Sequence, residues 1–305
     1  MRAGLALLLA STALACAGDL QDGGACSDGV CDSGQESAVA SNLAGTRIRI
    51  MGANITSGNA QSYTPGEGTR IFQGLDPDIA MLQEFNYGSN STADIRSFVN
   101  TAFGTSFSYF REGGSKQIPN GIVSRYPIKA SGAWDDPQVS NREFAWARID
   151  IPGTADLWAI SVHLLTSSAA TRETEATALV SFIKNNVPST DYVAIGGDFN
   201  TGSRMEAAIG KFSSVFVTSG PYPVDASGNG NTNASRGKPY DWVLANGKLN
   251  NLATPVTIGS ASFSNGLVFD SRVFTPLSSV SPVRSSDSAA TNMQHMAVVR
   301  DFVIP

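Results

Sequence analysis

Short apolar segments recur along the chain after Thr46. Thr46–Met51 alternates polar and apolar positions, whereas Asp78–Leu82 is a compact apolar run of the kind found in buried strands. Five further segments have the length and composition of strands: Phe144–Asp150, Leu157–His163, Tyr192–Gly197, Tyr240–Ala245 and Ala297–Val303. The pattern predicts a domain built from many short strands.

Two other segments carry apolar residues at the i, i+3, i+4, i+7 spacing of an amphipathic helix. One follows Ser91-Thr92 and ends before Gly104, and the other follows Ser167-Ser168; serine is a favoured residue at a helix start. The apolar positions are Ile95, Phe98, Val99 and Ala102 in the first segment, and Ala176, Leu179, Val180 and Ile183 in the second. Strands and helices together indicate an α/β domain.

The stretch from Thr218 to Lys238 shows no period and is rich in Gly, Asn, Ser and Pro. Loops of this length inside a domain are uncommon and often functional. Because Asp241 follows it closely, we expect either a loop that faces the substrate or a mobile excursion.

The N-terminus has the pattern of an export signal. A basic start at Met1-Arg2 precedes an apolar stretch too short to span a bilayer, and small residues end it before Cys16. Residues 1–15 are therefore predicted to be a signal peptide. Lipidation of Cys16 is favoured, because it would leave Cys26 and Cys31 as a pair able to form a disulfide. The alternative is cleavage by ordinary signal peptidase, which leaves Cys16 unpaired.

Residues 16–44 contain almost no large apolar side chain and are interpreted as a flexible tether. Residues 45–305 then form a single domain. The predicted location is the outer membrane or cell surface as a lipoprotein, or the exterior as a secreted protein; a monomer is expected. The net charge of −5 provides no basic footprint for a polyanion, although a bound divalent cation would reverse the local field.

The chain has only two histidines, His163 and His295, and each lies at the edge of a predicted strand. Glu84 follows one buried strand, and Asp198 and Asn200 follow another. Carboxylates are costly to desolvate, so acids that converge at strand ends favour a cation site. The alternative for each residue alone is a turn cap or a hydrogen-bonded structural role.

Seven short motifs occur in an order that resembles the endonuclease/exonuclease/phosphatase superfamily, which includes deoxyribonuclease I and neutral sphingomyelinases. They are Met51-Gly52-Ala53-Asn54-Ile55, Leu82-Gln83-Glu84, Asn120-Gly121-Ile122-Val123-Ser124-Arg125-Tyr126-Pro127-Ile128, Ser161-Val162-His163-Leu164, Gly197-Asp198-Phe199-Asn200, Tyr240-Asp241-Trp242-Val243-Leu244 and Gln294-His295-Met296-Ala297-Val298. The resemblance implies a deoxyribonuclease I-like α/β fold, a four-layer sandwich of two packed mixed β-sheets flanked by helices.

The same resemblance implies roles for the motif residues. Asn54 and Glu84 would hold Mg²⁺, with Mn²⁺ or Ca²⁺ as alternatives. Asp198 would orient or deprotonate the attacking water, and Asn200 would contact the phosphoryl oxygens. Asp241 would support the metal and transition-state shell.

The two histidines, His163 and His295, would flank the scissile phosphate, but their individual roles stay open. Arg142, in Ser140-Asn141-Arg142-Glu143-Phe144-Ala145, is similar to a phosphate-contacting arginine of the deoxyribonuclease I branch, and its alternative is a surface arginine at a strand edge. Arg236 is a weaker candidate for phosphate binding.

The last motif departs from the family, because Gln294 stands where an Asp usually orients the histidine. Gln294 could accept the ring N–H but brings no charge, so we expect His295 to be less basic than in the relatives, unless another carboxylate such as Asp287 assists.

The leading functional prediction is an exported, metal-dependent phosphodiesterase, a nuclease acting on DNA or RNA. One alternative is a sphingomyelinase-like lipid phosphodiesterase or a phosphatase. The other is a catalytically silent binding module on the same scaffold.

Overall fold

The computed structural model describes residues 45–113 and 116–305. The predicted signal peptide and tether, with Cys16, Cys26 and Cys31, lie outside these residues. Within the described residues, the larger sheet is made of β1 (Thr46–Ala53), β2 (Ile79–Leu82), β3 (Ser108–Arg111), β4 (Gly121–Ser124), β10 (Ala253–Thr254), β13 (Leu267–Phe269) and β14 (Ala297–Ile304). Its order is β10-β14-β1-β2-β4-β3, and β13 pairs with β14.

The second sheet has the order β5-β6-β7-β8-β9. Its strands are β5 (Ile128–Trp134), β6 (Phe144–Ile149), β7 (Leu157–His163), β8 (Tyr192–Asp198) and β9 (Asp241–Ala245). Both sheets are mixed, since β1 runs parallel to β2 but antiparallel to β14, and β8 runs parallel to β7 but antiparallel to β9. A separate hairpin is formed by β11 (Val256–Ile258) and β12 (Ala261–Phe263).

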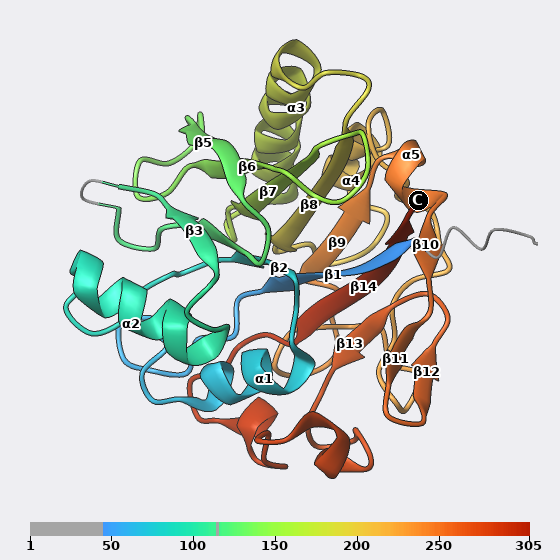
Figure 1. Cartoon of the computed structure of the whole chain (residues 1–305). Coiled ribbons are helices and arrows are strands. Elements are labelled where there is room, and N and C mark those ends of the chain that lie inside the picture. The colour runs from blue at the N-terminus through green and yellow to red at the C-terminus, as the bar shows by residue number, and fades with distance from the viewer. Residues whose placement is uncertain (1–44, 114–115) are drawn as a thin grey trace, which may run out of the picture. The chain divides into compact units, whose positions relative to one another are not determined.

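Helices cover the outer faces of the two sheets (Figure 1). α1 (Glu67–Leu75) and α2 (Thr92–Ala102) pack on the larger sheet, and α3 (Ala169–Asn186) and α4 (Ala207–Phe212) pack on the smaller one. The remaining helical turns are α5 (Gly247–Asn250), η1 (Leu277–Val280) and η2 (Asp287–Ala289). The prediction of a four-layer sandwich is confirmed.

Three apolar clusters follow from these layers. The central one lies between the sheets and contains inward-facing side chains such as Ile50 of β1 and Met81 of β2. Phe72 and Phe98 anchor the cluster under α1 and α2, and Leu179 belongs to the cluster under α3. Each strand between two clusters is buried on both faces, which explains the near-continuous apolar runs in the sequence.

Both predicted helices are confirmed. The Ser91 side chain accepts a hydrogen bond from the Asp94 N–H at the start of α2, and the Ser168 side chain accepts one from the Thr171 N–H at the start of α3. The helix α1 was not predicted, because Gly68 and Gly74 interrupt its sequence with weak helix formers.

The two sheets approach each other closely where β1 meets β8 and β9. A Cβ atom on Gly52 would lie 2.9 Å from the Trp242 carbonyl oxygen and 3.0 Å from the Gly197 amide nitrogen. A Cβ atom on Gly196 would lie 2.4 Å from the Met81 methyl carbon. Glycine at these positions lets the two sheets bring their ends together.

The segment from Thr218 to Lys238 is held to the domain at several points. The Arg236 guanidinium lies between the carboxylates of Asp225 and Asp270, and Asn233 forms a β-bridge with His295. Met296 N–H donates to the Thr232 carbonyl. The structure therefore places this loop beside one histidine rather than as a free excursion. Within the described ranges, none of the helices has the length and apolar character required to cross a membrane.

Candidate active site

Three strands of the smaller sheet place polar side chains side by side. His163 is the last residue of β7, Asp198 the last of β8 and Asp241 the first of β9. His163 is the register partner of Asp198, which is in turn the partner of Asp241. Because β9 runs antiparallel to β8, its first residue lies at the same edge as the last residue of β8.

The larger sheet contributes three more polar side chains, from the edge that adjoins these strand ends. Asn54 directly follows β1, Glu84 lies two residues beyond β2, and His295 lies two residues before β14. Glu84 has a φ of 52°, a left-handed conformation that is uncommon for a residue other than glycine. The packed strand ends thus bring together residues that are far apart in the sequence.

The carboxylate of Asp198 is the centre of this group. Its Oδ2 atom lies 3.3 Å from His163 Nε2, 3.4 Å from His295 Nε2 and 3.3 Å from Asn54 Nδ2. Burial raises the pKa of Asp198 to about 6, although the positive charge of His295 acts in the opposite direction. Near neutral pH the carboxylate is therefore a base with both imidazoles within reach.

His295 is paired with Asp241. Its Nδ1 lies 3.0 Å from Asp241 Oδ2, and both side chains are buried. Burial acts to lower the pKa of His295, but the negative charges of Asp241 and Asp198 outweigh it and raise that pKa to about 10. Although Gln294 brings no charge, His295 therefore has an anionic partner in Asp241, and the comparison of its basicity with that in the relatives stays a prediction.

The proposed orienting residue, Gln294, is corrected. Gln294 is exposed, and its side chain forms no hydrogen bond with the His295 ring in the described part of the chain. Asp287 does not assist either, because both of its carboxylate oxygens bind Arg70. The prediction assigned the role to the sequence neighbour of the histidine, whereas the ring nitrogen points across to the start of β9.

The pKa of His163 is shifted in the opposite direction to that of His295. Burial lowers its pKa well below the ordinary value, and the positive charges of Arg142 and His295 add to this effect. Its Nδ1 is buried and has no hydrogen-bond partner among the described residues. The site thus combines a neutral imidazole and an imidazolium on either side of one carboxylate.

Asn54 and Glu84 form the oxygen-rich end of the site. Glu84 accepts hydrogen bonds from Asn54 Nδ2 at 3.1 Å, Gln61 Nε2 at 3.1 Å and Thr56 Oγ1 at 2.7 Å. Burial raises its pKa. The Asn54 Oδ1 atom is buried without a partner among the described residues. An unsatisfied amide oxygen beside a buried carboxylate fits a hard divalent cation.

A different trio also lies close together, since ligand atoms of Asp198, Asp241 and His295 are all within 4.8 Å of one another. We favour Asn54 and Glu84 as the metal end, because each nitrogen of the His295 ring already faces a carboxylate, Asp241 at 3.0 Å and Asp198 at 3.4 Å. The contacts within the trio are those of an ion-pair network.

Asn200 and Arg142 both lie in the site and hold its framework. Asn200 Nδ2 donates to Asp198 Oδ2 at 3.1 Å and to the Leu164 carbonyl at 2.9 Å, so its amide fixes the Asp198 carboxylate. Arg142 is buried, and its Nε donates to the His163 carbonyl. Contact of either residue with a phosphate stays a prediction. Arg236 is instead engaged by Asp225 and Asp270.

Several residues around this site are not among the predicted site residues. Thr56 and Gln61 bind Glu84, and Asn120 is fully buried with its Oδ1 unpartnered among the described residues. Asp136 and Glu175 lie behind Arg142, and burial raises the pKa of both, to about 8 for Glu175. Asn120 stands at the head of one of the seven motifs and Glu175 lies in a predicted helix, whereas Thr56, Gln61 and Asp136 stand in segments without a pattern.

The family model described as the endonuclease/exonuclease/phosphatase family matches residues 61–287. This chain belongs to that family. Asn54 and His295 lie outside the matched range, so their place in the site rests on the geometry above.

Solved structures with a similar fold include a family protein from Bacteroides vulgatus, which is 14% identical with a TM-score of 0.59, over 85% of this chain and 100% of that one. A second, from Bacteroides thetaiotaomicron, is 14% identical with a TM-score of 0.58, over 86% and 99%. TDP2 from Caenorhabditis elegans is 14% identical with a TM-score of 0.52, over 85% and 74%. At these identities the likeness concerns the fold. The curated proteins provide no sequence match.

Proposed function

We propose that this member of the endonuclease/exonuclease/phosphatase family is a divalent-metal-dependent phosphodiesterase, with nucleic acid as its substrate. One observation carries the proposal: Asp198 Oδ2 lies within 3.4 Å of two imidazoles whose pKa values are shifted in opposite directions. Environments that separate the pKa values of neighbouring groups are typical of acid–base sites.

Each residue has a chemical task in phosphodiester hydrolysis. Asp198, with a pKa of about 6, accepts a proton from the attacking water. The His295 imidazolium, held by Asp241, stabilises negative charge on a phosphoryl oxygen. The neutral His163 donates a hydrogen bond to the reacting group from one ring nitrogen.

Asn54 and Glu84 would hold the cation, which would supply Lewis-acid stabilisation of the phosphoryl charge. Asn54 also donates to both Glu84 and Asp198, so it links the metal end to the base. Arg142, buried beside His163, brings a positive charge to the same edge of the sheet. Nucleic acid is favoured as substrate because the resemblance is to the deoxyribonuclease I branch.

The proposal is tested with the purified protein on single- and double-stranded DNA, on RNA, and on sphingomyelin and phosphomonoesters, each with Mg²⁺ or with chelator. We expect Mg²⁺-dependent cleavage of a nucleic acid, abolished by Asp198→Asn. Cleavage of sphingomyelin or a monoester alone would move the assignment to a lipid phosphodiesterase or a phosphatase. If no phosphoester is cleaved with Mg²⁺, Mn²⁺ or Ca²⁺, the chain is a binding module.

We further propose that the protein is exported and anchored through Cys16. The basic start, the apolar stretch and the small residues before Cys16 support this. Incorporation of a labelled fatty acid in the producing cell, lost in Cys16→Ser, is the expected result. Equal labelling of the variant would exclude the anchor.

A further inference from the structure

Arg300 occupies an inward-facing position in β14. Side chains alternate along a strand, so Arg300 points to the same side as Val298 and Phe302. Both of these neighbours are buried in the cluster between the two sheets. Arg300 itself is half-buried, and a cation between two core positions is costly unless an anion meets it.

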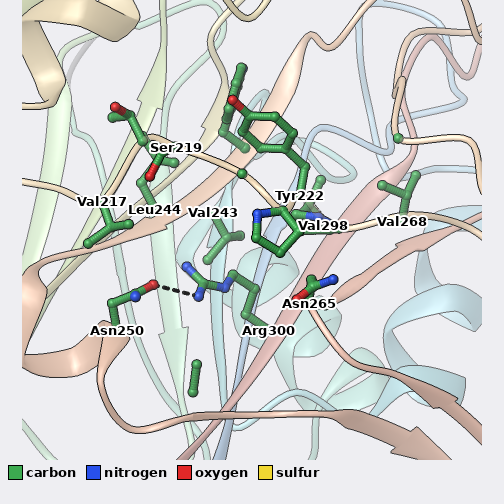
Figure 2. A pocket seen from close by; sticks show the side chains of 18 of the residues that line it. Val217, Ser219, Tyr222, Val243, Leu244, Asn250, Asn265, Val268, Val298 and Arg300 are labelled. Carbon is green, nitrogen blue, oxygen red and sulfur yellow. Dashed lines mark hydrogen bonds between the residues drawn. The ribbon is translucent and has the colours of Figure 1, made fainter.

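The guanidinium of Arg300 has no such partner among the described residues. Its Nη2 donates to Asn250 Oδ1 at 2.8 Å, a neutral amide (Figure 2), and no described carboxylate lies within 4.0 Å of it. By contrast, Arg49 of the same sheet forms two hydrogen bonds with the carboxylate of Asp301. Burial alone lowers the pKa of Arg300, to about 10.

A cavity of about 200 Å³ lies in front of Arg300, between β9, β14 and the loop of residues 217–223. Figure 2 shows the guanidinium projecting among its lining side chains. The walls are mostly apolar, and they include Val217, Tyr222, Val243, Leu244, Val268 and Val298. Apolar side chains therefore face the Arg300 guanidinium across the cavity.

A second guanidinium, that of Arg204, lines the same cavity. It stacks on the rings of Tyr222 and Trp242, with its central carbon 4.5 Å and 5.5 Å from the ring centroids. Its hydrogen-bond acceptors, the Gly230 carbonyl and Asn231 Oδ1, are both neutral. The second cation adds to the positive potential of the cavity.

Two acidic residues also border the cavity, and each carboxylate has a cationic partner elsewhere, although Asp241 Oδ1 is buried without a hydrogen bond among the described residues. Asp301 binds Arg47 and Arg49, and Asp241 binds His295. Within the described residues, Arg300 therefore has no carboxylate partner, and its guanidinium carbon lies 5.1 Å from the centroid of the Phe302 ring.

We propose that this cavity is a binding site for a compact organic carboxylate with an apolar body, separate from the phosphodiesterase site. The carboxylate would pair with the Arg300 guanidinium, and the apolar body would contact the valine and leucine side chains. An apolar cavity of about 150 Å³ holds a benzene-sized ligand, so an aromatic ring with one carboxylate matches the space.

The test is isothermal titration calorimetry of the full chain with benzoate. Benzamide serves as a neutral ligand of similar shape, and inorganic phosphate serves as an anion without an apolar body. We expect benzoate to bind and the other two to bind at least about tenfold more weakly. Arg300→Met should lower the benzoate affinity by at least about tenfold. Arg96→Met, on α2 and away from the cavity, is the matched control and should leave it unchanged.

A second variant provides an independent test in case Arg300→Met does not fold. Ser219 is exposed on the loop that borders the cavity, so Ser219→Phe should fold normally and obstruct the ligand. Loss of benzoate binding in both variants supports the site. No benzoate binding to the unmodified chain, equal binding of benzamide, or unchanged affinity in Arg300→Met would each overturn the proposal.

Discussion

The charge of His295 depends on Asp241, and Asp241→Asn removes that charge with little change in shape. At about 4 Å and an effective dielectric constant of about 20, one charge pair is worth about 4 kcal/mol, or about three pKa units. With a pKa of about 10 in the unmodified chain, His295 should titrate near pH 7 in Asp241→Asn. In the unmodified chain His295 is an imidazolium throughout the neutral range. In Asp241→Asn this charge would be lost above about pH 7.

Nuclear magnetic resonance of the imidazole groups measures this directly, because the chain has only two histidines. The titration is run with chelator, so that no bound cation contributes. His295 of the unmodified protein should stay protonated through pH 8, while His163, whose pKa burial lowers, stays neutral. In Asp241→Asn, one signal should titrate near neutrality.

Activity provides the second readout for Asp241→Asn. We expect kcat to fall by about 10²- to 10⁴-fold at pH 8, in the range seen when a buried carboxylate that orients a catalytic histidine is made neutral. Gln294→Ala is the matched control, since Gln294 is exposed, and it should keep the His295 titration and kcat. The reasoning is refuted if His295 of Asp241→Asn remains protonated at pH 9, or if Gln294→Ala shifts the titration as far.

Three further predictions concern the metal, the pH dependence of stability and the packing of the sheets. Glu84→Gln should weaken activation by Mg²⁺ at least about tenfold, because the cation loses its buried carboxylate; an unchanged Mg²⁺ requirement would place the metal elsewhere. Burial raises the pKa of Glu175 in the folded chain to about 8, against 4.5 for the free group. Its contribution to the free energy of unfolding is therefore full below pH 4.5 and is lost as pH rises to about 8. Glu175→Gln should therefore flatten the fall of the melting temperature over that range, whereas Glu173→Gln, half-exposed on the same helix and paired with Lys211, should not. Gly52→Ala should lower the free energy of unfolding by about 1–3 kcal/mol, measured by urea denaturation, because the new methyl group meets backbone of the other sheet; an unchanged midpoint would contradict this.

The sequence was sufficient to predict the elements with a strong pattern. The long strands β1, β7, β8 and β14 and the capped helices α2 and α3 lie where their periodicity and serine caps indicated. Short edge elements such as β3, with four half-buried residues, have no such pattern. Their pairing depends on neighbouring strands rather than on their own composition.

The site was predictable as a set of residues but not as a set of contacts. Glu84 and Asp198 could be found because each follows a buried strand. The pairing of His295 with Asp241 could not, because it joins residues 54 positions apart and depends on the starts of β9 and β14 lying close together. The resemblance pointed to the adjacent Gln294 instead, which faces solvent.

The loop from Thr218 to Lys238 has a consequence for protein engineering. Its Asn233 pairs with His295, and Thr232 binds both Met296 N–H and Asp241 N–H. The loop and the segment that enters β14 therefore form one unit, with His295, the proposed catalytic histidine, held between them. A chimera that exchanges this loop with that of a relative should also exchange the residues around His295, because a loop transplanted alone would leave the histidine's backbone without its partners.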